Sequence, residues 1–216
     1  MQADPSTYVQ ADLRFLIPVS AGETVAILGD VPELATALEE ERIQTYVIYL
    51  PTEAAEIPLQ TASVDHILLP LLGKHRHTWL ISEMARILKP GGWAFIGLRN
   101  AHSLQRLAFW KRDEQGRVAP PFSVRHFYKD MERAGFSDLT SFGVSKDLTH
   151  PQFLIPLERS VASHFFFDRI YSPSSLGAAV AQKMAALITS AGMQSILFKD
   201  VLVLGQKRIT SSGANV

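Results

Sequence analysis

The sequence has no cysteine, no long apolar run and no surplus of charge of either sign. Without cysteine, disulfide bonds, thiolate catalysis and cysteine-ligated zinc or iron–sulfur centres are excluded. No uncharged run approaches the roughly 18 residues that a membrane-spanning helix needs, so no stable membrane insertion is expected. Because 21 basic residues are balanced by 21 acidic ones, the chain lacks the basic surplus of a broad nucleic-acid-binding face. We expect partners to be a small molecule or a protein, not nucleic acid.

The length of 216 residues and the apolar fraction of 47% fit one globular domain over residues 1–216. Residues 1–15 carry acidic and polar side chains where a signal peptide has a basic start and an apolar core, so a cytoplasmic location is predicted. Residues 149–192 are predicted to form an insertion or lid within the domain. The polar residues 209–216 are predicted to form a flexible tail.

Strand-like and helix-like segments alternate along the chain. Short apolar, β-branched runs predict strands at residues 23–28, 43–50, 63–72 and 93–98, with a last strand within 193–208. Helical spacing and end signals predict helices at residues 32–42, 78–88 and 123–135. Ser123 and Gly135 are the expected caps of the last of these helices. This alternation predicts an α/β, Rossmann-like fold, with a mostly parallel sheet and helices on both faces.

Three short motifs follow one another between Ile57 and Asn100. They are Ile57-Pro58-Leu59, Ser63-Val64-Asp65 and Glu83-Met84-Ala85-Arg86-Ile87-Leu88-Lys89-Pro90-Gly91-Gly92. In this order they resemble the central part of class I S-adenosylmethionine-dependent methyltransferases, particularly the small-molecule group. The resemblance extends over residues 23–140 and implies a class I methyltransferase-like fold. Read from the residues alone, the Lys-Pro-Gly-Gly run is a helix stop followed by a tight turn.

The resemblance places the cofactor at the stretch ILGDVPEL, at the carboxyl end of the first strand. The family pattern Asp-x-Gly-x-Gly-x-Gly falls on Ile27, Gly29, Val31 and Glu33, so only its first glycine is present. The branched side chain of Val31 and the carboxylate of Glu33 are expected to crowd the cofactor's amino-acid moiety. Ile27 cannot accept a hydrogen bond from the cofactor's ammonium group.

Two further departures concern the flank of the same site. The second strand ends in Tyr49, Leu50 and Pro51, where an acidic residue would normally accept both ribose hydroxyls; a tyrosine cannot replace this bidentate acceptance. Only 13 residues separate Leu50 from Val64, whereas one parallel crossover alone takes a dozen or more. The family places a helix and a strand in this interval, so we predict that the chain lacks one helix–strand unit.

These departures predict a methyltransferase-like protein with a degenerate S-adenosylmethionine site, serving as a non-catalytic or repurposed binding or partner subunit. The alternative is an active, divergent O- or N-methyltransferase that acts on a small metabolite or saccharide precursor. In that case the cofactor would bind near Leu28, Gly29, Asp30, Tyr49 and Leu69. The base would be His75 or His102. No metal is expected, because His75 and His77 lack a third ligand at a recognisable spacing.

Three stretches have open interpretations. Residues 74–77, Lys-His-Arg-His, are either an anion site or a solvated basic loop. Asn100 and His102 follow the fourth strand and either line the cleft or cap a loop. Phe165 to Phe167 cannot all point into one core from a helix, so they indicate a lid or a partner surface, with core packing as the alternative. A partner surface there would allow an oligomer through residues 149–192. The helix expected next carries apolar residues along one side: Leu176, Val180, Met184, Leu187 and Ile188.

Overall fold

The computed structural model describes residues 19–29, 31–50, 56–72, 77–104, 122–145, 148, 151–170 and 176–209. The strands are β1 (Thr24–Leu28), β2 (Gln44–Ile48), β3 (Val64–Leu69), β4 (Leu88–Arg99), β5 (Phe136–Ser145), β6 (Phe153–Pro156) and β7 (Asp200–Lys207). The helices are α1 (Pro32–Glu40), α2 (His77–Ile87), α4 (Val124–Arg133), α5 (Ser160–Phe165) and α6 (Leu176–Ser190). A π-helical turn (Phe166–Ile170) and a 3₁₀ turn (Gln194–Leu197) complete the described elements. No helix of this described part has the length and apolarity needed to cross a membrane.

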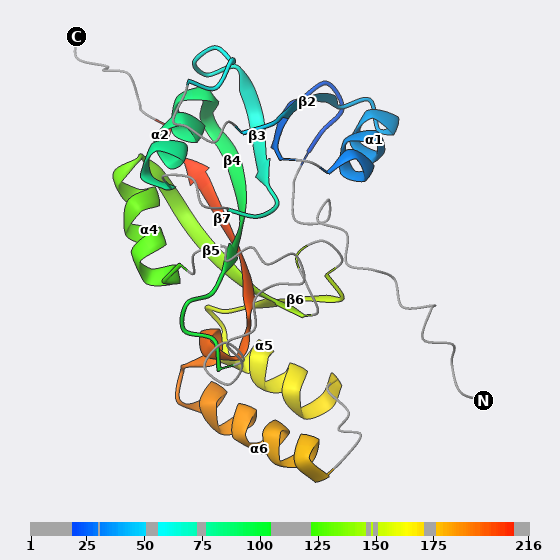
Figure 1. The fold of residues 1–216 in the computed structure, drawn as a ribbon, viewed down its shortest axis with the longest axis vertical. Helices are drawn as coiled ribbons and strands as arrows, with labels where there is room; N and C mark the ends of the chain where they lie inside the picture. Colours follow the sequence, from blue (N-terminus) through cyan, green and yellow to red (C-terminus); the bar gives the residue numbers. More distant parts are fainter. Residues whose placement is uncertain are drawn as a thin grey trace.

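The sheet has the strand order β2-β1-β3-β4-β7-β5-β6 (Figure 1). On one side of it, β2, β1, β3 and β4 pair in parallel. On the other side, β7 is antiparallel to both β4 and β5, and β6 is antiparallel to β5. The predicted α/β, Rossmann-like class is confirmed, but the mostly parallel sheet needs correction, because the second half of the sheet is antiparallel. The direction of β7 follows from its chain connection, which its own apolar pattern does not reveal.

The two outermost strands of the sheet, β2 and β6, differ in the chain segments that surround them. At one edge lies β2, and between Ile48 and Val64 the described residues form neither helix nor strand. This agrees with the predicted lack of a helix–strand unit. At the other edge, β6 (Phe153–Pro156) pairs with β5 in the register Gly143 to Ile155. Part of the predicted insertion 149–192 therefore belongs to the sheet itself.

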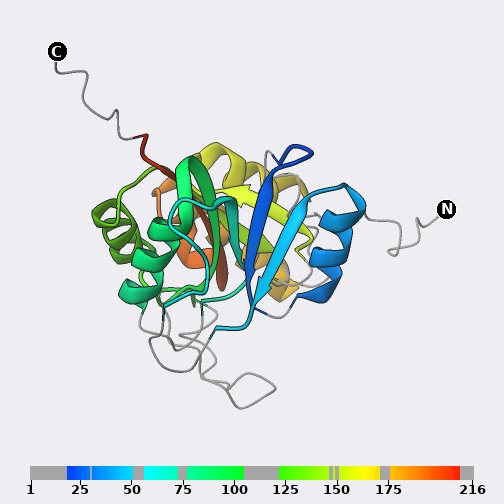
Figure 2. The ribbon, with the colours of Figure 1, turned by 90° about the horizontal axis from the view of Figure 1, so that it is seen from above.

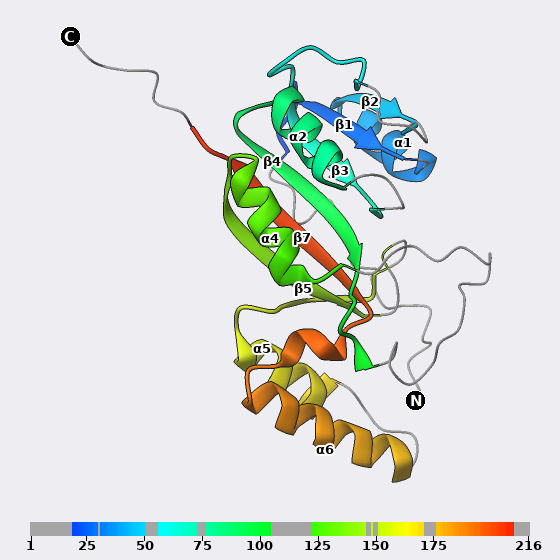
Figure 3. The same ribbon diagram turned by 60° about the vertical axis from the view of Figure 1, so that its left-hand side comes forward.

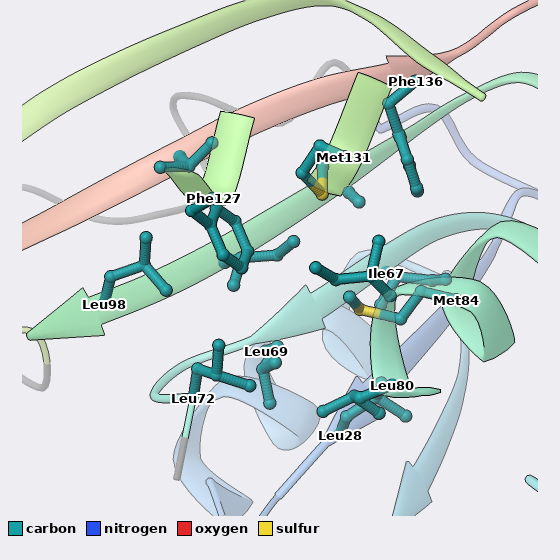
Figure 4. Close-up of a cluster of buried hydrophobic side chains, with 14 of the residues drawn as sticks. Leu28, Ile67, Leu69, Leu72, Leu80, Met84, Leu98, Phe127, Met131 and Phe136 are labelled. Atoms are coloured by element: carbon teal, nitrogen blue, oxygen red, sulfur yellow. The ribbon is translucent and has the colours of Figure 1, made fainter. Parts of the chain in front are cut away.

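The buried strands alternate between two cores, which explains their apolar runs. In β1, Val25 and Ile27 face a cluster covered by α1, whereas Ala26 and Leu28 face a cluster covered by α2 and α4. Figure 2 shows α1 and the α2–α4 pair on opposite sides of the molecule. Figure 4 shows the larger cluster, where side chains from β3, β4, α2 and α4 converge. The predicted covering of both faces by helices is thus confirmed.

The Lys-Pro-Gly-Gly run ends α2 as predicted, but it forms a bulge inside β4 instead of a turn before it. Val64 pairs with Leu88 while His66 pairs with Trp93, so the ladder skips several residues of β4. Gly91 has a φ of +81°, a conformation that favours glycine. A Cβ on Gly92 would collide with the carbonyl oxygen of Asp65. Both glycines are therefore needed where β4 leaves the helix and joins β3.

Beyond the carboxyl ends of β4 and β5 lie α5 and α6, at one end of the molecule (Figures 1 and 3). The 3₁₀ turn that precedes β7 is tied to the end of β4 by Asn100, whose side-chain nitrogen donates to Ser195 O (2.7 Å) and Phe198 O (3.1 Å). Ser123 occupies the predicted N-cap of α4, but its side chain makes no cap hydrogen bond. Gly135 follows the helix with a φ of +96°, as expected of a residue that ends one.

Candidate functional site

The residues predicted to hold a cofactor come together at the carboxyl ends of β1, β2 and β3. Leu28 and Leu69 are the last residues of β1 and β3, and each is 1% exposed. Figure 4 shows both side chains in the larger hydrophobic cluster. Because these leucines pack into the core, only the backbone at these two positions is placed to face a ligand.

Gly29 has the positive φ and the open space around its Cα for which a glycine is needed at this position. Its φ is +137°, and a Cβ added to it would meet only Pro70 Cδ, at 3.9 Å. Its N–H donates to Ile48 O (3.0 Å) and continues the ladder between β1 and β2. The backbone at Gly29 is therefore open to a close neighbour. Asp30, the next predicted cofactor residue, lies outside the described residues.

Ile27 and Val31, two further positions of the glycine pattern, have no side chain that could hydrogen-bond to the amino-acid moiety of the cofactor. Ile27 is fully buried in the cluster under α1, so its side chain is closed to any ligand. Val31 is the N-cap residue of α1 and makes no side-chain cap hydrogen bond. Its branched Cβ stands beside the helix N-terminus, where a glycine would leave the backbone N–H groups accessible.

Tyr49, at the tip of β2, is 71% exposed and so forms no enclosed wall for a ribose. Acidic residues are absent from the described residues that follow the parallel strands: Gly29 and Val31 after β1, Tyr49 and Leu50 after β2, Pro70 to Leu72 after β3, and Asn100 to Leu104 after β4. S-adenosylmethionine carries an ammonium group and a ribose diol that need hydrogen-bond acceptors. None of these described residues supplies a carboxylate, so the charged acceptor for the ammonium group and the bidentate acceptor for the ribose diol are not found among them. Asp30 after β1 and Glu53 after β2, two acidic residues that the sequence places near this end of the sheet, lie outside the described residues.

The loop after β3 fills the neighbouring stretch of the same edge. Leu72 is fully buried, and its N–H donates to Gly97 O (2.8 Å). A Cβ on Gly97 would collide with the carbonyl oxygen of Pro70. A glycine inside a strand pattern signals a close backbone approach, so Gly97 is the residue from which this contact could be predicted.

The two candidate bases, His75 and His102, differ in whether the structure describes them. His75 lies outside the described residues, together with Lys74 and Arg76. His102 is exposed on the turn after β4, and its backbone N–H donates to Asn100 Oδ1 (3.0 Å). Asn100 is 2% exposed and its amide tethers the 3₁₀ turn. Of the two open interpretations for Asn100, the structure supports loop capping.

His77 opens α2 and joins it to α4. Its Nε2 lies 3.2 Å from Asp130 Oδ2, and its ring packs edge-on against Phe122 at a centroid distance of 5.4 Å. These contacts are between helices on one face of the sheet, which indicates a role in packing. In the described part of the chain, no group of three or more His, Asp or Glu residues is arranged to hold a metal ion.

The motif residues on which the resemblance rests lie at the other end of the strands, the amino ends, which we call the amino edge; the end with Gly29 is the carboxyl edge. Asp65 of β3 accepts hydrogen bonds from Lys89 Nζ (2.8 Å) and from the N–H of Thr24 (3.0 Å). One carboxylate thus ties β1, β3 and β4 together. Burial alone would raise the pKa of Asp65, but the hydrogen bonds from Lys89 and Thr24 hold it below its ordinary value.

A second clamp joins α2 to the Ile57-Pro58-Leu59 segment. Glu83 accepts from Arg86 Nη2 (2.8 Å) and from the N–H of Ile57 (3.0 Å). Arg86 also donates to Leu59 O (2.8 Å) and Ile57 O (2.9 Å). The hydrogen bond from Arg86 lowers the pKa of Glu83 against the opposing effect of burial. The family-like motifs therefore act here as a structural brace.

The three consecutive phenylalanines divide between core and surface. Phe166 is 7% exposed and packs edge-on against Phe153 at a centroid distance of 5.4 Å. Phe167 packs against Phe198 with tilted rings at a centroid distance of 5.9 Å, while Phe165 is 57% exposed. The π-helical turn places two neighbouring rings inward. Core packing therefore holds for Phe166 and Phe167, and the predicted partner surface is reduced to Phe165.

Two shallow cavities lie away from the predicted cofactor residues. One, of about 480 Å³, is lined by residues 56–61 and Arg86, at the amino edge. The other, of about 630 Å³, is lined by residues 158–162 and Phe165. Near it, Tyr128 donates to Glu158 Oε1 (3.0 Å), and burial raises the pKa of Tyr128 above its ordinary value. Neither cavity includes Leu28, Gly29, Tyr49 or Leu69.

Comparison with known proteins agrees with this geometry. Solved structures with the same fold include an S-adenosylmethionine-dependent methyltransferase from Archaeoglobus fulgidus, with 18% identity, a TM-score of 0.58, and coverage of 90% of this chain and 91% of that one. Another is phosphoethanolamine N-methyltransferase 2 from Haemonchus contortus, solved with S-adenosyl-L-methionine, with 14% identity, a TM-score of 0.55, and coverage of 91% and 51%. A third is a complex of the Trm112 methyltransferase activator of Haloferax volcanii with a methyltransferase, with 15% identity, a TM-score of 0.51, and coverage of 91% and 87%.

Residues 11–96 match the model of a family described as a methyltransferase domain. No curated protein matches the chain. The resemblance inferred from the motifs is confirmed, and the chain is methyltransferase-like, with the class I fold.

Proposed function

We propose that this methyltransferase-like chain does not bind S-adenosylmethionine and serves as a non-catalytic binding or partner subunit. The observation that carries the proposal is that no carboxylate occurs among the described residues directly after β1, β2, β3 and β4, at the carboxyl ends of these strands. There, Leu28 and Leu69 turn into the core and Tyr49 extends into solvent. An ammonium group bound there would have no charged acceptor among these residues and a ribose diol no bidentate one, and each hydrogen bond left unmade would cost about 1–3 kcal/mol.

The loss of the flank supports the same proposal. With β2 at the edge of the sheet, a cofactor beside Tyr49 would stay open to solvent. The Haloferax neighbour is solved as a two-protein complex with an activator, so this fold occurs as one subunit of an assembly. A subunit role for this chain would use the fold without its transfer chemistry.

Isothermal titration of the full chain with S-adenosylmethionine tests the proposal. We expect no saturable heat up to millimolar ligand, with S-adenosylhomocysteine behaving in the same way. Micromolar binding would overturn the proposal and favour the alternative, an active divergent O- or N-methyltransferase on a small metabolite.

Two glycine variants make the titration specific. Gly29→Val fills the open backbone position at the carboxyl edge, and Gly22→Val is its matched control. Gly22 also has a positive φ (+92°) and has no atoms near its missing Cβ, but it precedes β1 at the other edge. If the wild-type chain binds and Gly29→Val alone abolishes binding, the cofactor site is intact and the proposal fails.

A further inference from the structure

The helix α6 (Leu176–Ser190) is joined to the rest of the molecule by small buried side chains. It packs against α5, the π-helical turn and the 3₁₀ turn, and Figure 3 shows α5 between α6 and the sheet. Among its described side chains, those of residues 179–190, the buried ones are Ala185 (6% exposed) and Thr189 (0% exposed). Because both side chains are small, their burial removes much less apolar surface from water than the burial of a leucine or a phenylalanine.

The larger apolar side chains of α6 point away from these contacts. Val180, Met184 and Leu187 are 63%, 52% and 63% exposed, so they add little to the docking of the helix. A hydrogen bond from Gln182 Nε2 to Phe167 O (2.6 Å) ties α6 to the π-helical turn. Its net contribution is modest, because both groups exchange hydrogen bonds with water for it.

The helix α4 shows how a surface helix of this molecule is anchored. It also lies on the outside of the sheet, but it inserts Phe127 (1% exposed) and Met131 (0% exposed) into the larger hydrophobic cluster (Figure 4). These are large side chains, whereas α6 buries an alanine and a threonine. The two helices should therefore differ in how easily they leave the body of the molecule.

The elements that receive α6 contain two buried polar atoms without a hydrogen-bond partner among the described residues. One is Oγ of Ser163, a fully buried residue of α5 four positions before Phe167. The other is Oε1 of Gln194, which is 7% exposed in the 3₁₀ turn. A buried polar group without a partner destabilises the closed packing, and water that enters between the elements would satisfy it.

We infer that α6 is a latch, which undocks from α5 and docks again while the sheet and the α2–α4 pair stay folded. Docking gains the burial of Ala185 and Thr189 and the hydrogen bond of Gln182, and it is opposed by the two polar atoms left without partners. Elements with few buried apolar contacts open locally, far more often than the whole domain unfolds. Undocking frees the Phe167 carbonyl and brings water to this face of α5. The latch is independent of whether the carboxyl edge binds a ligand.

Hydrogen exchange of the full chain, measured by mass spectrometry, tests the inference with α4 as the internal reference. We expect the amides of residues 181–190 to be at least about tenfold less protected than those of α4. Low concentrations of urea should leave the exchange of α6 unchanged and accelerate that of α4, because local undocking exposes little surface. A smaller difference in protection would overturn the inference, and so would an equal dependence on urea.

Two substitutions distinguish a latch from a helix that only frays. Gln182→Met removes the hydrogen bond to Phe167 O and should speed exchange in α6 by about fivefold. Ser163→Ala removes the hydroxyl that has no partner and should slow exchange in α6 by a similar factor. The matched control is Ser82→Ala, because Ser82 is exposed on α2 and donates to Thr78 O. It should leave α6 unchanged. Exchange in α6 that responds to neither Gln182→Met nor Ser163→Ala would overturn the inference.

Discussion

The two edges of the parallel half-sheet differ in chemistry, although the same four strands form both. At the amino ends of the strands, Asp65 accepts from Lys89 and Thr24 and so joins β3 to β4 and β1, whereas Glu83 and Arg86 join α2 to the segment before β3. At the carboxyl ends of the strands, Leu28 and Leu69 are buried, Tyr49 is exposed, Asn100 is hydrogen-bonded to the 3₁₀ turn, and the N–H of Leu72 donates to Gly97 O. The family-like residues are kept where they hold the fold together. At the carboxyl end of β1, only Gly29 is present of the family's glycine pattern.

The contacts at the amino ends show that family-like residues can stabilise the fold independently of what the carboxyl ends bind. The Glu-x-x-Arg and Lys-Pro-Gly-Gly residues stabilise the junction of α2 and β4 whatever happens at the other edge. If the difference is real, substitutions at the amino edge should affect folding strongly. Substitutions at the carboxyl edge should affect folding little.

The largest expected effect is that of Gly92→Ala. Its new methyl group would collide with the carbonyl of Asp65 and press on Leu88, so we expect the free energy of unfolding to fall by about 3 kcal/mol. Urea denaturation, monitored by circular dichroism, measures this free energy of unfolding. The control Gly135→Ala meets no atoms within 4 Å and pays only for its φ of +96°, about 1 kcal/mol. Equal losses in both variants would contradict the role given to Gly92.

The second-largest loss of stability is expected when the hydrogen-bonded clamp between α2 and the segment before β3 is broken. Arg86→Met leaves Glu83 without its cation and two backbone carbonyls without their donor, so the free energy of unfolding should fall by about 2 kcal/mol. Arg133→Met is the control, because Arg133 is 77% exposed and pairs with Asp130 at the surface of α4. It should cost at most about 0.5 kcal/mol. A loss at Arg86 as small as at Arg133 would show that the clamp is not a brace.

Acidic pH should weaken the hydrogen bonds that the Asp65 and Glu83 carboxylates accept at the amino ends of the strands. The pKa values of Asp65 and Glu83 are lowered in the folded chain. Their stabilisation is therefore complete above the unfolded values near 4 and is lost as the pH falls through the lower folded values. The double variant Asp65→Asn/Glu83→Gln should lose less stability than the wild type, by about 1–2 kcal/mol, between pH 7 and pH 3. Urea denaturation at both pH values measures this difference; parallel losses would refute it.

The smallest effect is expected at the tip of β2. Tyr49 is 71% exposed, so Tyr49→Ala should change the free energy of unfolding by no more than about 0.5 kcal/mol. Thermal unfolding of the variant beside the wild type checks this. A loss several times larger would mean that Tyr49 packs against other parts of the chain, and the contrast between the two edges would weaken.

Most of the parallel half was predictable because its signals are local. Apolar runs and helix ends placed α1, α2 and α4 within two residues at each end. The strand β5 (Phe136–Ser145) was not predicted, because Ser, Asp and Thr interrupt its apolar pattern and Asp138 has a positive φ of 50° within it. Its burial is supplied by β7 and β6, which lie far away along the chain.

The candidate site was predictable in position but not in detail. The rule for open α/β sheets brought Leu28, Gly29, Tyr49 and Leu69 to one edge. The packing of Pro70 on Gly97 depends on a backbone approach between two strands that no short segment encodes. The sequence likewise identified the apolar side of α6 but not its outward direction, because burial of Ala185 and Thr189 against α5 and the π-helical turn is decided by tertiary contacts.

Calorimetric titration with S-adenosylmethionine tests the central claim most directly, with folding checked in the same sample by thermal unfolding. We expect a fully folded chain that gives no saturable heat at millimolar ligand. A folded chain that binds the ligand with a micromolar dissociation constant, and loses this binding in Gly29→Val but not in Gly22→Val, would contradict it.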